Sequence, residues 1–181
     1  MKVLMIFADG FEDVEAIVTR DVLIRAGIEV VDARINDKDL VVASHKLHLT
    51  NFVYLGDVNL KDFKAVILPG GSRGVNNLLA SQLVLKVVKE AHELGLLISA
   101  ICAAPMVLGE AGLLTDKRFT CYPGCEEGLD GIYTGEEVVV LDNMITARSM
   151  LYSIPFGLAI IEKLLGVETR DRIYKQIAGL K

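Results

Sequence analysis

The sequence has no tryptophan, few other aromatic residues and no excess of basic residues. Aromatic residues make up 6% of the chain, so the stacking surfaces that bind single-stranded nucleic acids are not evident. Lys and Arg number 19 against 24 Asp and Glu, which gives a net charge of −5. We therefore expect no partnership with nucleic acid or with an anionic membrane surface.

Long apolar runs are also missing. None approaches the roughly 20 residues that a helix needs to cross a bilayer. The apolar segment 1–8 is short, and the acidic Asp9, Glu12 and Asp13 follow it directly, which is not the pattern of a secretory signal. We expect a cytoplasmic protein with no membrane partner.

Cysteine is scarce, and its spacing suggests no disulfide framework. The three residues are Cys102, Cys121 and Cys125. The last two are spaced like half of a metal site, but no second pair or nearby histidine completes it, so we expect no metal. Free thiols in a reducing cytoplasm are the simplest interpretation, with Cys121 and Cys125 as structural thiols.

The order of apolar patterns predicts a single α/β domain over residues 1–181. A chain of this length can bury roughly 70% of its unfolded surface. Short apolar runs alternate with segments of helical periodicity, which favours a mostly parallel sheet covered on both faces. The expected strands are 2–7, 29–35, 64–68, 96–101, 137–141 and 144–147. The expected helices are 12–26, an irregular one over 74–94, one that follows Cys102 and ends near 111, 155–164 and 167–180.

The segment 36–57 departs from this alternation. Two short apolar-polar stretches, 40–43 and 47–49, predict a hairpin or an excursion at the sheet edge. His45 and His48 have a spacing that metal ligands can show, but exposed side chains on a hairpin are the better interpretation. The segment 118–131 is rich in turn residues and predicts no regular element.

Cys102 ends an apolar run and precedes small residues, in Leu96-Leu97-Ile98-Ser99-Ala100-Ile101-Cys102-Ala103-Ala104-Pro105. This pattern predicts a buried strand, a sharp turn at the cysteine and then a helix. Backbone N–H groups at a helix start favour a thiolate, which is the nucleophilic form of cysteine. The alternative is that Cys102 is simply a small buried hydrophobic residue.

Two further features follow predicted strands at the same edge of the sheet. Gly70 and Gly71 come after the strand 64–68, where glycines let backbone N–H groups approach an anion or oxyanion. Glu15 lies early in the first helix between apolar neighbours. Alternatively, the glycines form a mere turn and Glu15 is solvated. If Glu15 contacts Cys102, we expect the pair to share a proton and titrate as a unit.

Three segments together resemble the ThiJ/PfpI family, in the branch of the parkinsonism-associated protein deglycase. They are Asp9-Gly10-Phe11-Glu12-Asp13-Val14-Glu15, Leu68-Pro69-Gly70-Gly71 and Ala100-Ile101-Cys102-Ala103-Ala104-Pro105. The segments Asp21-Val22-Leu23-Ile24-Arg25-Ala26-Gly27 and Thr146-Ala147-Arg148 extend the likeness over nearly the whole chain. The combination is specific for the family, although each motif alone is not.

The resemblance implies a flavodoxin-like three-layer α/β sandwich, a homodimer, and a nucleophile elbow that carries Cys102. It implies that Glu15 is the protonated partner of this cysteine. It also implies that amides near Gly71 and Ala103 bind an oxyanion, and that Arg25 reaches the site of the partner subunit. An exposed arginine is the alternative for Arg25.

The sequence also departs from the family pattern. Ala103 stands where the peptidase branch has a histidine, so a peptidase is not expected. The segment 126–137 has no histidine, whereas the branch often supplies a histidine to its cavity from there. Residues 149–152 replace a Gly-Pro-Gly-Thr segment, which predicts a bulkier and more apolar cavity wall.

The expected activity is a cofactor-free, cysteine-dependent reaction on small α-oxoaldehydes such as methylglyoxal. It would be that of a glyoxalase III-like lyase or of a deglycase-type hydrolase, with a link to oxidative stress. The first alternative is a redox sensor or protective chaperone that uses Cys102 oxidation without turnover. A weaker alternative is a protein associated with thiamine (thiazole) biosynthesis, since some family names point there.

Overall fold

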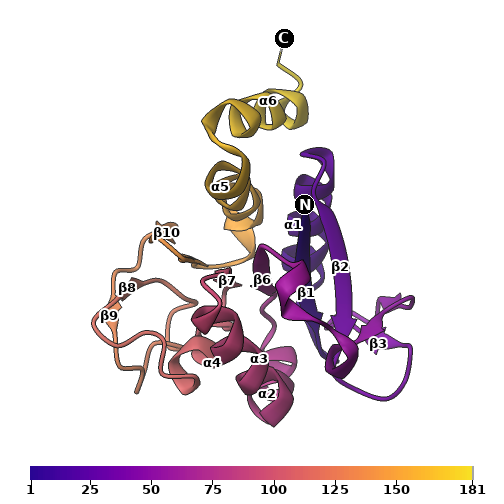
Figure 1. The fold of residues 1–181 in the computed structure, drawn as a ribbon. Coiled ribbons are helices and arrows are strands. Elements are labelled where there is room, and N and C mark those ends of the chain that lie inside the picture. The colour runs from indigo at the N-terminus through magenta and orange to yellow at the C-terminus, as the bar shows by residue number, and fades with distance from the viewer. Residues whose placement is uncertain (181) are drawn as a thin grey trace.

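The computed structural model describes residues 1–180, and a seven-stranded sheet forms its centre (Figure 1). The strands of this sheet are β1 (Lys2–Phe7), β2 (Glu29–Arg34), β5 (Val53–Tyr54), β6 (Ala65–Leu68), β7 (Leu97–Ile101), β10 (Val138–Val140) and β11 (Met144–Ala147). Their order is β10-β11-β7-β6-β1-β2-β5. Every neighbouring pair is parallel except β10 with β11, which is antiparallel.

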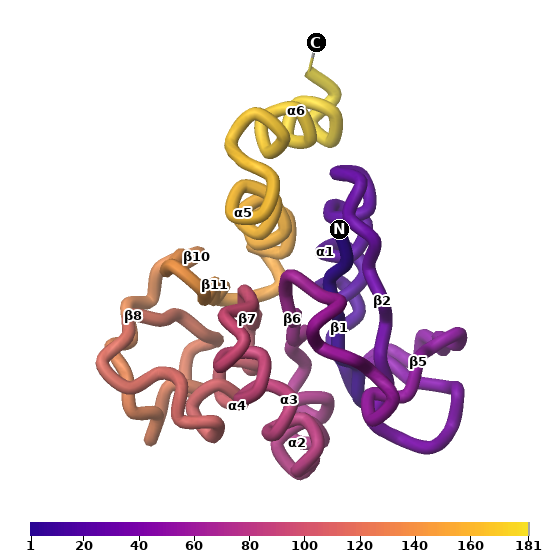
Figure 2. The backbone as a smooth tube through the Cα atoms, viewed as in Figure 1, coloured from indigo at the N-terminus to yellow at the C-terminus, as the bar shows by residue number. Residues whose placement is uncertain are grey.

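Helices cover both faces of the sheet, as Figures 1 and 2 show. One layer contains α1 (Asp13–Arg25), α5 (Ser153–Leu165) and α6 (Val167–Ala178). The opposite layer contains α2 (Ser72–Leu79), α3 (Gln82–Glu93) and α4 (Pro105–Glu110). Three short 3-10 helices are η1 (Leu55–Asp57), η2 (Leu60–Asp62) and η3 (Met150–Tyr152). Within residues 1–180, no helix has both the length and the apolar character needed to cross a bilayer.

The two-sided burial follows from the pleat of the central strands. Successive side chains of a strand point to opposite faces. Leu4 and Ile6 of β1 pack into the core beneath α2, α3 and α4. Val3 and Met5 pack into the other core, with α1, α5 and α6. A strand buried on both faces must be apolar at every position, which is why β1 reads as a continuous apolar run.

The expected flavodoxin-like α/β sandwich is confirmed, and the expected strands match those observed at nearly the same residues. The irregular helix expected over 74–94 is two helices, α2 and α3. They are separated at Ala80 and Ser81, where Ser81 is extended and its side chain accepts a hydrogen bond from the Val84 N–H at 3.3 Å. Ser81 is therefore the N-cap of a new helix.

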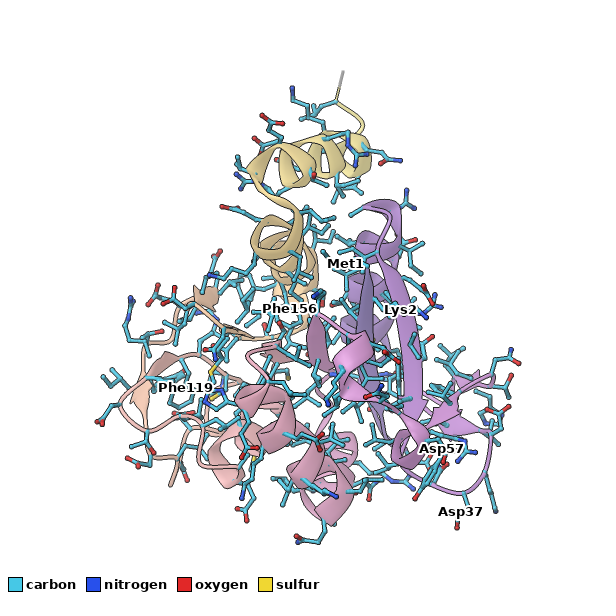
Figure 3. The ribbon with its side chains drawn as sticks, in the orientation of Figure 1. Met1, Lys2, Asp37, Asp57, Phe119 and Phe156 are labelled. Atoms are coloured by element: carbon cyan, nitrogen blue, oxygen red, sulfur yellow. The ribbon has the colours of Figure 1, made fainter. Side chains whose placement is uncertain are left out.

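Two segments outside the alternating pattern carry short strands. The hairpin expected over 36–57 is present as β3 (Val41–Val42) and β4 (His48–Leu49), which pair antiparallel. Beyond it, β5 adds an edge strand to the main sheet, in the segment for which an excursion at the sheet edge was the other expectation. The turn-rich segment 118–131 has β8 (Arg118–Phe119) at its start, paired with β9 (Ile132–Tyr133). Figure 3 labels Phe119 of β8 in this lobe and Phe156 of α5.

Candidate functional site

Three neighbouring strands of the sheet, β7, β6 and β1, bring the expected site residues together. Cys102 follows β7, Gly70 and Gly71 follow β6, and Glu15 lies in the first turn of α1 after β1. Because the strands are parallel, their carboxyl ends meet at one edge of the sheet, where α/β proteins place their ligands. Residues far apart in the sequence thus converge on one point.

Cys102 sits on a strained turn. Its φ is +63°, in the left-handed region that costs a residue with a side chain roughly 1–2 kcal/mol. Hydrogen bonds to both the N–H and the carbonyl of Cys102 hold this conformation. The Cys102 N–H donates to the Ala147 carbonyl at 2.9 Å, and the Cys102 carbonyl accepts the Tyr122 N–H at 2.8 Å. Strain held by surrounding hydrogen bonds is typical of a functional residue.

Glu15 is buried beside this cysteine. Its side chain is only 1% exposed, and its Oε2 accepts the Gly70 N–H at 3.0 Å. The Glu15 N–H donates to Glu12 Oε2 at 2.8 Å, so Glu12 caps the helix and holds its first turn in place. Within residues 1–180, Glu15 Oε1 has no hydrogen-bond partner. A carboxyl oxygen left unpaired in the interior favours the protonated form.

The two glycines make room for this pair. A Cβ on Gly70 would come within 2.3 Å of Glu15 Oε2 and 2.7 Å of the Cys102 Cβ, so both side chains lie against its face. Gly71 has a φ of +95°, and a Cβ there would lie 2.5 Å from the Gly10 carbonyl oxygen. Only glycine fits either position without displacing backbone or site atoms.

Burial dominates the electrostatics of the pair. It raises the pKa of Glu15 from 4.5 to about 7, against the lowering effect of hydrogen bonds from Cys102 and Gly70. Burial also raises the pKa of the Cys102 thiol, and the neighbouring Glu15 raises it further. The N–H groups of Ala103 and Gly71 donate toward the sulfur and lower its pKa only in part. The helix-start effect expected from the sequence is outweighed, and burial favours the neutral form of both the thiol and the carboxyl.

A cavity of about 610 Å³ opens over Cys102. Cys102 and Ala103 lie on one wall, with the backbone of Gly71 beside them. The lining combines apolar side chains with a few polar ones, as small-molecule sites commonly do. Besides these three, the lining residues are Glu12, Ser44, His45, Ser72, Val75, Asn76, Met106, Tyr122, Pro123, Gly124 and Cys125.

His45 is a cavity residue that sequence reasoning missed. The expected exposed position on the hairpin is correct, since the His45 side chain is 77% exposed, but His45 also lines the cavity, which His48 does not. Its Nδ1 lies 3.1 Å from Asp13 Oδ2. The possible ligand atoms of Glu12, Asp13 and His45 lie within 4.8 Å of one another. No spacing rule could have found His45, because its place depends on where the hairpin packs.

Other expected residues lie away from Cys102. Arg25 pairs with Asp21 at 2.6 Å and lines a separate surface groove, so within its own chain it does not reach the cavity. Cys121 is fully buried, whereas Cys125 lines the cavity. Residues 149–152 do not line it, so the bulkier wall expected from that segment is not observed.

A flavodoxin-like sandwich with a strained cysteine after a central strand, faced by a buried glutamate, defines the class of this protein. Comparison with known proteins gives the family. The profile of the DJ-1/PfpI family matches residues 1–163, and the chain belongs to that family. The resemblance seen in the sequence motifs is thereby confirmed.

The relatives cover almost the whole chain. The chain is 37% identical over 175 residues to Protein dj-1beta of Drosophila melanogaster, covering 95% of this chain and 94% of that protein. It is 32% identical over 173 residues to Glutathione-independent glyoxalase DJR-1.2 of Caenorhabditis elegans, covering 94% of this chain and 91% of that protein. The crystal structure of Drosophila DJ-1beta superposes with a TM-score of 0.92 at 36% identity, covering 98% and 97% of the two chains.

Proposed function

We propose that this protein is a cysteine-dependent enzyme that needs no cofactor and acts on small α-oxoaldehydes such as methylglyoxal. The observation that carries the proposal is the position of Cys102, which lines a cavity beside a buried Glu15 whose pKa burial raises to about 7. A relative with 32% identity is named a glutathione-independent glyoxalase, which supports the same class of reaction.

The first step of the proposed reaction is addition of the thiol to the aldehyde carbon. The sulfur of Cys102 forms a bond to that carbon, the carbonyl π bond breaks, and the thiol proton passes through the Glu15 carboxyl to the oxygen. The product is a hemithioacetal. The N–H groups of Gly71 and Ala103, which already donate toward the sulfur, lie where they can hold the developing oxyanion.

The second step converts the hemithioacetal to a thioester of lactate. The hydrogen on the former aldehyde carbon leaves as a proton and the adjacent ketone carbon gains one. The hydroxyl of the hemithioacetal gives its proton to the ketone oxygen and becomes the thioester carbonyl, so no external oxidant or reductant is needed. Water then attacks the thioester carbon, the carbon–sulfur bond breaks, and lactate and the free thiol remain. A deglycase-type reaction on early adducts of these aldehydes would begin with the same nucleophile.

Incubation with methylglyoxal tests the proposal. We expect the wild type to form lactate and Cys102→Ser to form none, because a serine hydroxyl is a far weaker nucleophile here. Cys121→Ala is the matched control, since that thiol is fully buried and does not line the cavity. Lactate formation by Cys102→Ser, or none by the wild type between pH 5 and 9, would contradict the proposal.

A second candidate function is a redox response of Cys102 without turnover. The N–H donors at its sulfur suit a sulfinate, and a relative from Toxoplasma gondii with 30% identity is described as oxidized DJ-1. Intact-mass analysis after mild hydroperoxide treatment tests this. We expect two oxygen atoms to be gained at Cys102 first, and earlier oxidation of Cys121 or Cys125 would count against it.

We also propose that the protein is a homodimer in a reducing compartment such as the cytoplasm. Its three cysteines are free. Ile17 of α1 and Ile154 of α5 are both exposed and line the surface groove of about 430 Å³ that also contains Arg25. Exposed apolar side chains gathered over two helices favour burial against a second copy. Arg25 would then lie at the subunit contact.

A further inference from the structure

The cavity over Cys102 has a second polar wall that the reaction above leaves unused. It is formed by His45, which lies at the tip of the β3–β4 hairpin, and by the start of α1. Asp13 Oδ2 accepts the backbone N–H of His45 at 3.1 Å and lies 3.1 Å from its ring Nδ1. One carboxylate oxygen thus binds both the backbone and the ring of the same histidine.

We propose that His45 is a catalytic proton-transfer residue of the Cys102 cavity and that Asp13 is its positioning residue. The inference rests on the proposed function and deepens it. With Nδ1 held by a carboxylate, the remaining ring nitrogen Nε2 is left free to accept or donate a proton. A carboxylate that orients an imidazole in this way is a recurring arrangement in nucleophilic catalysis.

The hairpin tip that carries His45 is fixed to the loop between β1 and α1. The Ser44 N–H donates to the Phe11 carbonyl at 2.8 Å, and the Ser44 hydroxyl donates to the Gly10 carbonyl at 2.9 Å. Val42 adds a third link, because its N–H donates to Asp9 Oδ1 at 2.8 Å. The same loop leads directly into the helix that carries Asp13 and Glu15. Both proton-handling groups are therefore held by one short segment.

Glu15 and His45 suit different proton transfers in the proposed reaction. Glu15 is buried next to the sulfur, so it can exchange the proton of thiol addition but has little access to water. The His45 side chain is 77% exposed and lines the cavity, so it can meet both substrate and solvent. It can move the proton from the aldehyde carbon to the ketone carbon. It can also take a proton from the water that attacks the thioester and return it to the sulfur as the carbon–sulfur bond breaks.

The test compares His45→Gln and Asp13→Asn with the control His48→Gln, which changes an exposed histidine of the same hairpin outside the cavity. With methylglyoxal we expect kcat of His45→Gln to fall roughly 100-fold or more, with KM within about three-fold of the wild type. Asp13→Asn should lose roughly ten-fold, because the ring is still present but less well oriented. His48→Gln should match the wild type.

Restoration of activity by added imidazole distinguishes a catalytic role of His45 from a structural one. Added imidazole should restore part of the kcat of His45→Ala, since a free base can occupy the vacated space, and it should leave Cys102→Ser inactive. Wild-type kcat in His45→Gln, an equal loss in His48→Gln, or no restoration by imidazole overturns this inference alone. Absence of lactate from the wild type overturns the proposed function and the inference with it.

Discussion

At the scale of single residues, the buried carboxyl of Glu15 links the site to stability. Its pKa is about 7 in the folded protein and 4.5 for an ordinary glutamate, so the folded state binds the proton more tightly than the unfolded state. The favourable contribution of the protonated group is complete below about pH 4.5. It is lost as the pH rises through about 7.

Glu15→Gln should therefore change the pH dependence of stability. The glutamine does not titrate, so the free energy of unfolding of the wild type should fall relative to the variant by about 3 kcal/mol between pH 4.5 and 8. Urea unfolding followed by circular dichroism at several pH values measures the difference. A constant difference across this range would show that Glu15 ionises normally.

Gly70 shows how closely the pair is packed. A Cβ there would overlap Glu15 Oε2 and the Cys102 Cβ, so Gly70→Ala should destabilise the protein by about 1–3 kcal/mol and change the alkylation rate of Cys102. Gly95→Ala is the control, because Gly95 has a positive φ but nothing within 4 Å of an added Cβ. The control should lose stability through backbone strain alone. An unchanged alkylation rate in Gly70→Ala would contradict the packing argument.

The positions of site residues could be predicted where the neighbouring sequence shows which strand they follow. Cys102, Glu15 and the two glycines each follow a recognisable strand, so their meeting at one sheet edge could be expected, although their catalytic roles stay predictions. His45 could not be found in this way. It reaches the cavity through a hairpin whose packing on Gly10 and Phe11 depends on contacts more than 30 positions apart in the sequence. The protonation of the pair also depends on burial, which only the folded structure reveals.

At the scale of elements, hydrogen bonds to the loop between β1 and α1 hold the β3–β4 hairpin in place. Ser44→Ala removes the hydrogen bond from its hydroxyl to the Gly10 carbonyl, which contributes about 1 kcal/mol. Local opening of the hairpin should then become roughly five-fold more frequent. Hydrogen exchange of the Val42 and Ala43 amides should accelerate by that factor, while amides of β1 and β7 stay unchanged. Equal protection of Val42 and Ala43 in both proteins would mean that other contacts hold the hairpin.

The central strands were predictable, because strands buried on both faces are marked by continuous apolar runs. The edge elements were not. The strands β5, β8 and β9 have two residues each, too short for any periodicity to show. The boundary between α2 and α3 depends on the capping by Ser81, which a nearly continuous helical pattern conceals. Signals that rest on one side chain are weaker than those that rest on a repeated pattern.

At the scale of the whole molecule, exposed apolar side chains on α1 and η3 favour contact with a second copy of the chain. The layer formed by α1, α5 and α6 covers the sheet, yet α1 also exposes Ile17 and Ile24 on its outer side. The 3-10 helix η3 precedes α5 and leaves the Leu151 side chain 76% exposed. An outer face of this kind is best explained if a second copy covers it, and dimers most often form through one self-complementary face.

Ile17→Asp should separate such a dimer. A carboxylate in the lining of this groove would have to be buried without a partner on assembly, which opposes association strongly. Light scattering should give the wild type twice the 19.7 kDa mass of one chain, and Ile17→Asp the mass of one. Leu94→Asp, an exposed apolar position at the end of α3 and outside the groove, should remain dimeric. A wild type with the mass of a single chain, or a dimeric Ile17→Asp, would mean that this face is not the subunit contact and that Arg25 has no partner site to reach.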